Sequence, residues 1–178
     1  MARKPREFTP GATYHIMNHF HEEIKLKHSQ IAVLRVILKK AAKKFNVKIV
    51  CFNIMINHFH LEIYFPKEGC GMSKFMHWLG TAMAIKVNKM LNHKGHVFFR
   101  RFKSKIITGL KHFYRILQYI SRNSFKHLRI LPKDWPYSSY HYYLKKIDDG
   151  ITTHLAEVLG VKKHDRLRKA IVSYLLYN

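Results

Sequence analysis

Acidic residues are scarce in this chain of 178 residues. It has 10 Asp and Glu against 33 Lys and Arg, which gives a formal net charge of +23. No acidic residue occurs from Gly69 to Lys133, although lysines and arginines recur throughout that stretch. A charge this high repels itself unless a polyanion is bound, so nucleic acid is the first partner to consider. A generally basic protein is the plainer alternative, but the long acid-free stretch favours a surface that follows phosphates.

Cysteines and long apolar runs are also few. Cys51 and Cys70 do not form a CxxC pair, which argues against a zinc finger built on thiolates. No apolar run approaches the length that spans a bilayer, and the basic N-terminus is not followed by the apolar stretch of a secretory signal. We therefore predict a cytoplasmic protein that has no membrane partner and no disulfide.

The hydrophobic periodicity predicts alternating strands and helices. Strands are expected at 12–20, 47–55, 58–65 and within 96–107, and helices at 31–45, 75–90 and from 110. This order predicts an α+β fold, a ferredoxin-like antiparallel sheet (βαββαβ) with helices on one face, followed by a third helix and a small helical extension. We expect residues 1–130 to form the main domain with a basic N-terminal arm. Residues 131–178 would be an aromatic extension, with short helices at 152–159 and 165–177, packed on the same domain.

The strand at 58–65 carries two histidines on one face. Its residues alternate, so His58, His60 and Glu62 point to one side while the apolar residues between them point to the other. If helices cover the apolar side, the histidines lie on an open face where a nucleic acid could bind. Two imidazoles placed in this way can chelate one metal ion. Taken alone, such a pair is more often two surface histidines, and Glu62 a solvated strand residue.

The third helix carries the residues that could complete such a site. Tyr119 and Asn123 are four apart and lie off the apolar stripe of this helix, among basic side chains. A phenol has a pKa of about 10 and is a weak nucleophile without help. A divalent ion held by His58, His60 and the amide oxygen of Asn123 would polarise a phosphodiester that Tyr119 attacks. Taken alone, Tyr119 would be a half-buried helix tyrosine, and only the combination favours catalysis.

Several segments in the same order carry a family resemblance. They are residues 11–16, the two histidines around a hydrophobic residue at 57–61, residues 95–98 with 101–104, the segment 119–123, and the aromatic segment 135–140. With these motifs the chain resembles the HUH single-tyrosine transposases of the IS200-like superfamily, and among them the REP-associated tyrosine transposases.

The resemblance implies a metal-dependent endonuclease and strand transferase that cuts single-stranded DNA near a hairpin, such as a REP-like palindrome. It implies a Mg²⁺ or Mn²⁺ ion, a covalent 5′-phosphotyrosine intermediate and a free 3′-hydroxyl. By matching position, His58 and His60 become metal ligands, Tyr119 the nucleophile and Asn123 the third ligand. The protein would be a monomer or a homodimer, bound to the nucleoid when on DNA, and Tyr119 could meet the histidines of its own chain or of a partner.

Two further expectations concern charged residues. Contacts to DNA phosphates are expected from Arg3, Lys4, Arg6, Arg100, Arg101, Lys103, Lys105, Arg115, Arg122 and Lys126. Glu62 could be an extra metal ligand, although an ion pair with a neighbouring Lys or Arg is the favoured role.

Two other functions compete with the enzyme. A non-catalytic nucleic-acid-binding module that keeps the transposase fold could stack bases on Phe98, Phe99 and Tyr140. A structural zinc site in an RNA-binding domain is a third reading, because imidazoles also suit zinc. The presence of both histidines and of a tyrosine on the third helix favours the enzyme.

Overall fold

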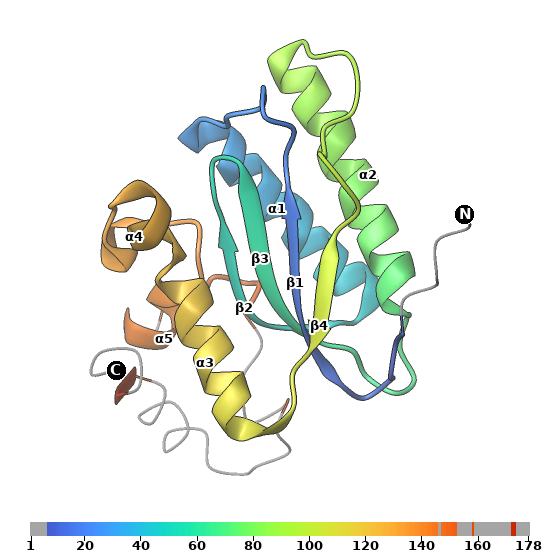
Figure 1. Cartoon of the computed structure of the whole chain (residues 1–178), viewed down its shortest axis with the longest axis vertical. Coiled ribbons are helices and arrows are strands. Elements are labelled where there is room, and N and C mark those ends of the chain that lie inside the picture. Colours follow the sequence, from blue (N-terminus) through green and yellow to red (C-terminus); the bar gives the residue numbers. More distant parts are fainter. Residues whose placement is uncertain (1–6, 146, 153–157, 159–171, 174–178) are drawn as a thin grey trace.

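The computed structural model describes residues 7–145, 147–152, 158, 172 and 173 (Figure 1). Arg3, Lys4 and Arg6 therefore lie outside the described residues. The same holds for nearly all of the helices expected at 152–159 and 165–177. Within the part of the chain that is described, no helix is long and apolar enough to cross a membrane.

Four strands form one antiparallel sheet. They are β1 (Thr13–His19), β2 (Lys48–Ile54), β3 (His58–Tyr64) and β4 (Lys103–Ile106), in the order β2-β3-β1-β4. Strands β2 and β3 are adjacent and antiparallel, and β1 lies between β3 and β4. This is the ferredoxin-like arrangement that the sequence predicts, although β4 is shorter than the segment expected to hold it.

Two long helices follow the first and third strands. Helix α1 is His28–Phe45 and helix α2 is Met72–Leu91. Both end at an asparagine in the left-handed conformation, Asn46 with φ 49° and Asn92 with φ 50°. Asparagine tolerates this conformation better than most residues, so it can end a helix and turn the chain back toward the sheet.

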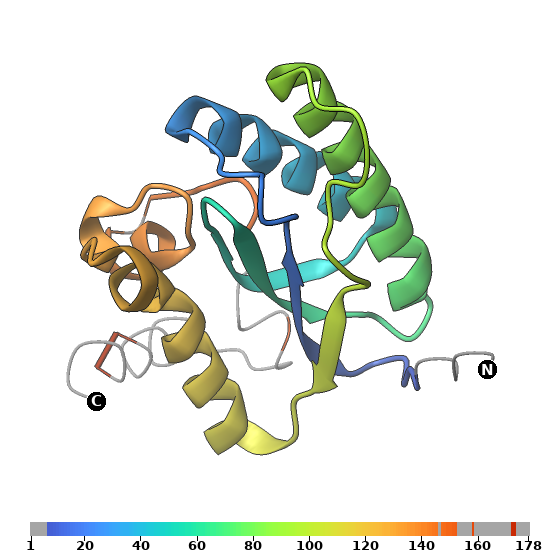
Figure 2. The same cartoon turned by 45° about the horizontal axis from the view of Figure 1, so that its top comes forward.

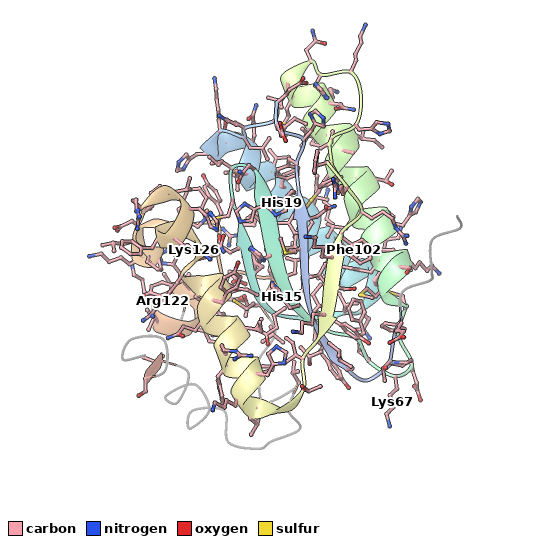
Figure 3. All side chains as sticks on the ribbon, viewed as in Figure 1. His15, His19, Lys67, Phe102, Arg122 and Lys126 are labelled. Carbon is pink, nitrogen blue, oxygen red and sulfur yellow. The ribbon has the colours of Figure 1, made fainter. Side chains whose placement is uncertain are left out.

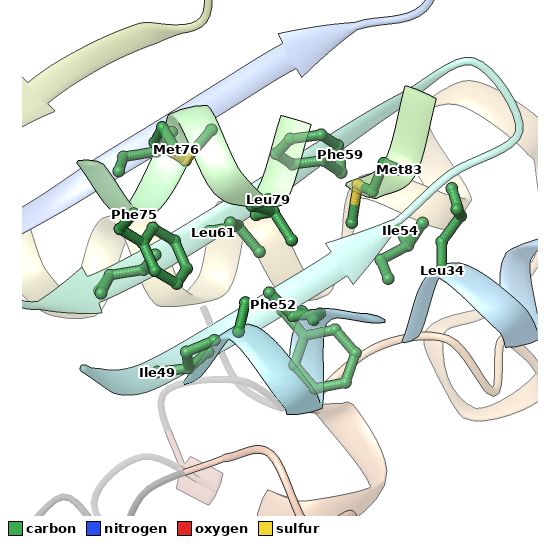
Figure 4. Close-up of a cluster of buried hydrophobic side chains, with 14 of the residues drawn as sticks. Leu34, Ile49, Phe52, Ile54, Phe59, Leu61, Phe75, Met76, Leu79 and Met83 are labelled. Atoms are coloured by element: carbon green, nitrogen blue, oxygen red, sulfur yellow. The ribbon is translucent and has the colours of Figure 1, made fainter. Parts of the chain in front are cut away.

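The main core lies between the sheet and these two helices. Phe59, Leu61 and Ile63 of β3 are fully buried there, and Phe52 of β2 and Leu79 of α2 pack in the same cluster (Figure 4). The apolar face of β3 therefore points toward α1 and α2, as its alternating pattern predicts.

A third helix covers part of the other face. Helix α3 (Gly109–Ser121) packs across β2 and β3 on the side opposite to α1 and α2 (Figure 2). Its Phe113, Leu117 and Ile120 form a second buried cluster with Val50 and Cys51 of β2. The expectation of an open sheet face at the two histidines is therefore wrong, because the amphipathic α3 buries its apolar stripe on that face.

Tyr119 and Asn123 do not share one helix. Helix α3 ends at Ser121, Arg122 has non-helical backbone angles of φ −87° and ψ 1°, and α4 (Asn123–Leu128) begins at Asn123. The expectation of one continuous helix through Tyr119 and Asn123 is therefore wrong, because the helix is interrupted at Arg122. A separation of four residues does not by itself place these two side chains on the same helix face.

The described part of the C-terminal segment packs on the same domain. The 3₁₀ helix η1 (Pro132–Asp134) leads to Trp135, which is fully buried in the main core and donates from Nε1 to the Ile54 carbonyl at 3.2 Å. Helix α5 (Tyr140–Lys145) follows, and Tyr143 belongs to the second cluster. This helix was not expected, because the sequence there shows an aromatic segment without clear periodicity.

Candidate functional site

Strand β1 brings two more histidines to the pair on β3. The strand register pairs His19 with His58 and Met17 with His60, and side chains of paired residues share a face. The His15 Nε2 atom lies 2.9 Å from His60 Nδ1, and the His19 ring stacks on the His58 ring at 5.0 Å between centroids. Figure 3 shows His15 and His19 in one row along β1. The alternation of residues 13–19 could have revealed this, because it puts both histidines on one face.

His58 lies between two amide oxygens. Its Nδ1 is 2.7 Å from Asn57 Oδ1, and its Nε2 is 2.8 Å from Asn123 Oδ1. Burial lowers the pKa of His58 to about 4, so the ring is neutral at pH 7 and carries one N–H. A neutral ring can donate to only one of these oxygens. Donation from Nε2 makes the contact with Asn123 Oδ1 a hydrogen bond, whereas donation from Nδ1 to Asn57 leaves the Nε2 lone pair and Asn123 Oδ1 available to one cation.

His60 is held by a histidine neighbour. It is 1% exposed, and burial, followed by the charge of His58, lowers its pKa to about 2. Burial also lowers the pKa of His15 to about 4, so His15 is neutral at pH 7 and can accept a hydrogen bond at Nε2. When His60 Nδ1 donates to His15, the Nε2 lone pair of His60 stays free for a metal. Metal-binding histidines commonly use their other nitrogen in this way.

Tyr119 lies beside the histidines of its own chain. Its ring centroid is 5.3 Å from that of His60 and 6.0 Å from that of His15. The ammonium of Lys126 lies 5.3 Å from the centre of the tyrosine ring. The side chain is 36% exposed, so a substrate strand can reach it. The sequence left open whether Tyr119 meets its own histidines, and within this single chain it does.

The end of α3 is fixed to the sheet next to this tyrosine. Asn53 of β2 donates from Nδ2 to the carbonyl of Ile120 at 2.8 Å, and both residues are fully buried. The Cys51 Sγ atom lies 3.8 Å from Ser121 Oγ. Asn53 of β2 is paired with His60 of β3 across the sheet. The residue that anchors the end of α3 is therefore a direct neighbour of a candidate ligand histidine. No pattern in the sequence distinguishes Asn53 from an ordinary strand asparagine.

The donor atoms at this place fit a divalent cation. Among the described residues, no three His, Cys, Asp or Glu side chains gather in a metal-binding group. The predicted ligands are two neutral imidazoles and one amide oxygen, of which His58 Nε2 and Asn123 Oδ1 lie 2.8 Å apart and the His58 and His60 rings 5.1 Å apart between centroids. Asn123 Nδ2 is buried without a hydrogen-bond partner in the described part of the chain. Exchanging the amide nitrogen and oxygen of Asn123 would give Nδ2 a partner in His58, but it would move Oδ1 away from that histidine. Mixed nitrogen and oxygen ligands suit hard and borderline divalent metal ions rather than soft ions, which prefer thiolates.

Glu62 is buried below this site rather than solvated. It is 0% exposed, and neither carboxylate oxygen has a hydrogen-bond partner among residues 7–145 and the other described positions. Burial in the apolar surroundings raises the pKa of the Glu62 carboxyl well above its usual value. The expected ion pair with Lys or Arg is absent within the same residues, and no metal-binding group there includes this carboxylate. The expected ion pair and the expected solvated position are therefore wrong, because α3 covers the face that Glu62 occupies, whereas its role as an extra metal ligand stays a prediction.

Exposed cations surround the histidines. Among the residues expected to contact DNA, those at Arg100, Arg101, Lys103, Lys105, Arg115, Arg122 and Lys126 are all exposed. Arg122 and Lys126 come from the α3–α4 side in Figure 3. On the other side a cleft of about 470 Å³ begins at His19 and Asn57 and is also lined by Arg100, Arg101 and Lys103. The surface on both sides of the site is therefore suited to a polyanion.

Comparisons with known proteins show the family of this chain. The sequence model of the family described as "Transposase IS200 like" matches residues 9–123, which include β1 through α3 and Asn123. The chain is 25% identical over 156 residues to a Haemophilus influenzae protein named as a REP-associated tyrosine transposase, covering 82% of this chain and 89% of that protein. The fold is similar, with a TM-score of 0.70 and 19% identity, to a REP-associated tyrosine transposase solved bound to a REP hairpin. That similarity covers 86% of this chain and 89% of the other. Since the family model matches well over half of its length, the chain belongs to the IS200-like transposase family.

Proposed function

We propose that this transposase is a metal-dependent single-strand DNA endonuclease and strand transferase that works near DNA hairpins through a covalent 5′-phosphotyrosine. The observation that carries the proposal is the Tyr119 ring 5.3 Å from His60, beside a donor set formed by His58, His60 and Asn123. Residues 1–130 would form the catalytic domain, with 131–178 as its extension.

The chemistry divides between the donor set and the tyrosine. A bound Mg²⁺ or Mn²⁺ would polarise the scissile phosphodiester and stabilise charge on its oxygens. The Tyr119 hydroxyl loses its proton and attacks phosphorus in line with the leaving oxygen. The bond from phosphorus to the 3′-oxygen breaks, and that oxygen takes up a proton to become a 3′-hydroxyl. Because one phosphodiester replaces another, the phosphotyrosine keeps the bond energy that a later strand transfer needs.

The residues around Tyr119 serve this step. Lys126 puts a positive charge 5.3 Å from the ring centre of the group that becomes negative during attack. Asn57 and His15 contact the outer nitrogens of His58 and His60, which fixes the orientation of both rings. The exposed arginines and lysines on both sides would hold flanking phosphates.

The substrate is inferred from charge and kinship. The net charge of +23 favours binding to a polyanion. A protein of similar fold, with a TM-score of 0.70, is described as bound to a REP hairpin. A hairpin with a single-stranded flank would present duplex phosphates to the basic surface and an unpaired phosphate to Tyr119.

The experiment is a test for a covalent adduct. The full chain is incubated with Mn²⁺ and labelled single strands that carry the palindromes flanking its gene, and the products are separated on a denaturing gel. A protein–DNA band is expected for the wild type and for Tyr114→Phe, a control on the same helix, and is expected to vanish for Tyr119→Phe. An equal band from Tyr119→Phe would refute the nucleophile. If no variant forms a band and Mn²⁺ binding does not depend on His58 and His60, the non-catalytic binding module is the better description.

A further inference from the structure

A cleft lies beside His19, next to the histidines of the candidate site. It measures about 470 Å³, within the ~300–1,000 Å³ that is usual for pockets of small organic ligands. His19 and Asn57 are among its lining residues, and both contact His58, His19 by ring stacking at 5.0 Å between centroids and Asn57 by a 2.7 Å contact to Nδ1. The cleft is therefore adjacent to His58, one of the predicted metal ligands.

The walls of the cleft combine an aromatic ring with cations. Phe99 is 48% exposed, and the guanidinium carbon of Arg100 lies 5.0 Å from its ring centre. The His21 ring lies 6.2 Å from the same ring. An exposed ring next to arginine and lysine is the composition that binds single-stranded nucleic acid, because bases stack on the ring while the cations hold phosphates. The backbone of Phe99 is tied to the sheet, since its N–H donates to the His19 carbonyl at 3.1 Å.

The cleft and Tyr119 lie on opposite sides of the histidine pair. Tyr119 contacts His60 and His15, whereas the cleft is lined by His19, four residues further along β1. Four strand residues span about 13 Å. His15 and His19 mark the two ends of this row in Figure 3. An in-line attack sends the leaving oxygen away from the nucleophile, hence toward His58 and the cleft.

Resting on the proposed function, we infer that this cleft binds the nucleotide on the 5′ side of the cleaved bond, the one that leaves with the free 3′-hydroxyl. Its base stacks on Phe99, and Arg100, Arg101 and Lys103 hold the phosphates that precede it. The bound nucleotide keeps the 3′-hydroxyl beside the donor set, ready to attack a phosphotyrosine in strand transfer. Glu22 is the acidic side chain among the residues that line the cleft, and it can accept a hydrogen bond from an exocyclic amino group such as that of cytosine.

The test measures binding of strand ends without cutting. One probe is a ten-nucleotide thymidine strand whose 3′-terminal base is 2-aminopurine with a free 3′-hydroxyl. The second probe carries 2-aminopurine at a phosphorylated 5′ end. Both are titrated with full-length Tyr119→Phe protein in Mn²⁺, and the fluorescence of 2-aminopurine falls when the base stacks.

Quenching of the 3′-end probe is expected, with Phe99→Ala abolishing it and weakening affinity about 10-fold, within the range measured for a base stacked on an aromatic ring. Phe99→Tyr keeps an aromatic ring and should show the same quenching and the same affinity for the 3′-end probe as the protein with Phe99. The matched control is Phe125→Ala, which removes another exposed ring with an arginine 5.9 Å from its centre and should change affinity less than 2-fold.

If the Phe99→Ala protein quenches the 3′-end probe as strongly as the protein that keeps Phe99, the terminal base does not stack on Phe99 and the assignment of the cleft is wrong. Stronger quenching of the 5′-end probe would overturn the direction of the strand. Because this measurement needs no cleavage, the two outcomes can be told apart. A missing covalent adduct would refute the role of Tyr119 but not the binding of a 3′-terminal nucleotide in the cleft, whereas an unchanged signal in Phe99→Ala would refute the cleft alone.

Discussion

Glu62→Gln tests whether the buried carboxyl is neutral in the folded protein. Glu62 is 0% exposed and both oxygens lack partners among the described residues, so its charged form is not solvated. Glutamine has almost the same shape but does not titrate. Any difference between the two proteins that grows with pH therefore comes from the carboxyl group itself.

The sign follows from the raised pKa of Glu62 in the folded state. Below the usual carboxyl pKa, both the folded and the unfolded chain are protonated, and Glu62 costs no ionisation energy. Above it, the unfolded chain releases a proton that the folded chain keeps, so stability falls as the pH rises toward the folded pKa. The loss is about 1.4 kcal/mol per pH unit within this window. Glu62→Gln should therefore match the wild type only below about pH 4, and should become progressively more stable than the wild type as the pH rises from there toward the folded pKa of Glu62.

Urea unfolding in EDTA at each pH provides the measurement, since EDTA removes any metal bound at the neighbouring histidines. For a chain of this size each kcal/mol corresponds to about 2–4 °C in Tm, so thermal scans give a second readout. Glu68→Gln is the matched control, because Glu68 is exposed and should show no divergence. Parallel stability curves for wild type and Glu62→Gln would refute the reasoning, since they would mean that the carboxyl is solvated in the folded state.

Two further predictions concern the metal and the DNA. Asn57→Ala removes the oxygen that contacts His58 Nδ1 and should weaken Mn²⁺ binding about 10- to 100-fold by calorimetry, and an unchanged affinity would show that Asn57 does not orient the ligand. For single-stranded DNA, log K should fall linearly with log salt, and Lys103→Ala should flatten the slope by about 0.7, as expected for one lost phosphate contact. Lys43→Ala, an exposed lysine at the end of α1, should leave the slope unchanged, and a flat line for the wild type would contradict the electrostatic argument.

The sheet could be predicted from the sequence because its signals are local. The alternation in β3 separates the histidine side from the side of Phe59 and Leu61, and the helical spacing in α1 and α2 identifies the residues that cover the second side. The order of these segments then leads to the ferredoxin-like sheet. The strand expected within 96–107 is shortened to Lys103–Ile106, which pairs with β1, while Phe98 forms an isolated bridge to Phe20.

The surroundings of the site could not be predicted, because they depend on how α3 lies on the sheet. Periodicity gives the apolar stripe of α3 but not the face on which it is buried. Its position on the histidine side turns Glu62 from an expected solvated residue into a buried, unpartnered one. The break at Arg122 is another tertiary result, since the spacing of Tyr119 and Asn123 suits one unbroken helix.

The sequence by itself determined the family to which this chain belongs and the candidate residues for its chemistry. A basic chain with paired strand histidines, a downstream tyrosine and an asparagine can be recognised from residue types and spacing alone. Only the tertiary structure decided the neighbours: His15 against His60, Asn53 holding the end of α3, and Tyr119 beside the histidines of its own chain. The physical reason is that residue spacing fixes which face a side chain occupies within its own strand or helix, whereas packing between distant segments fixes what that face meets.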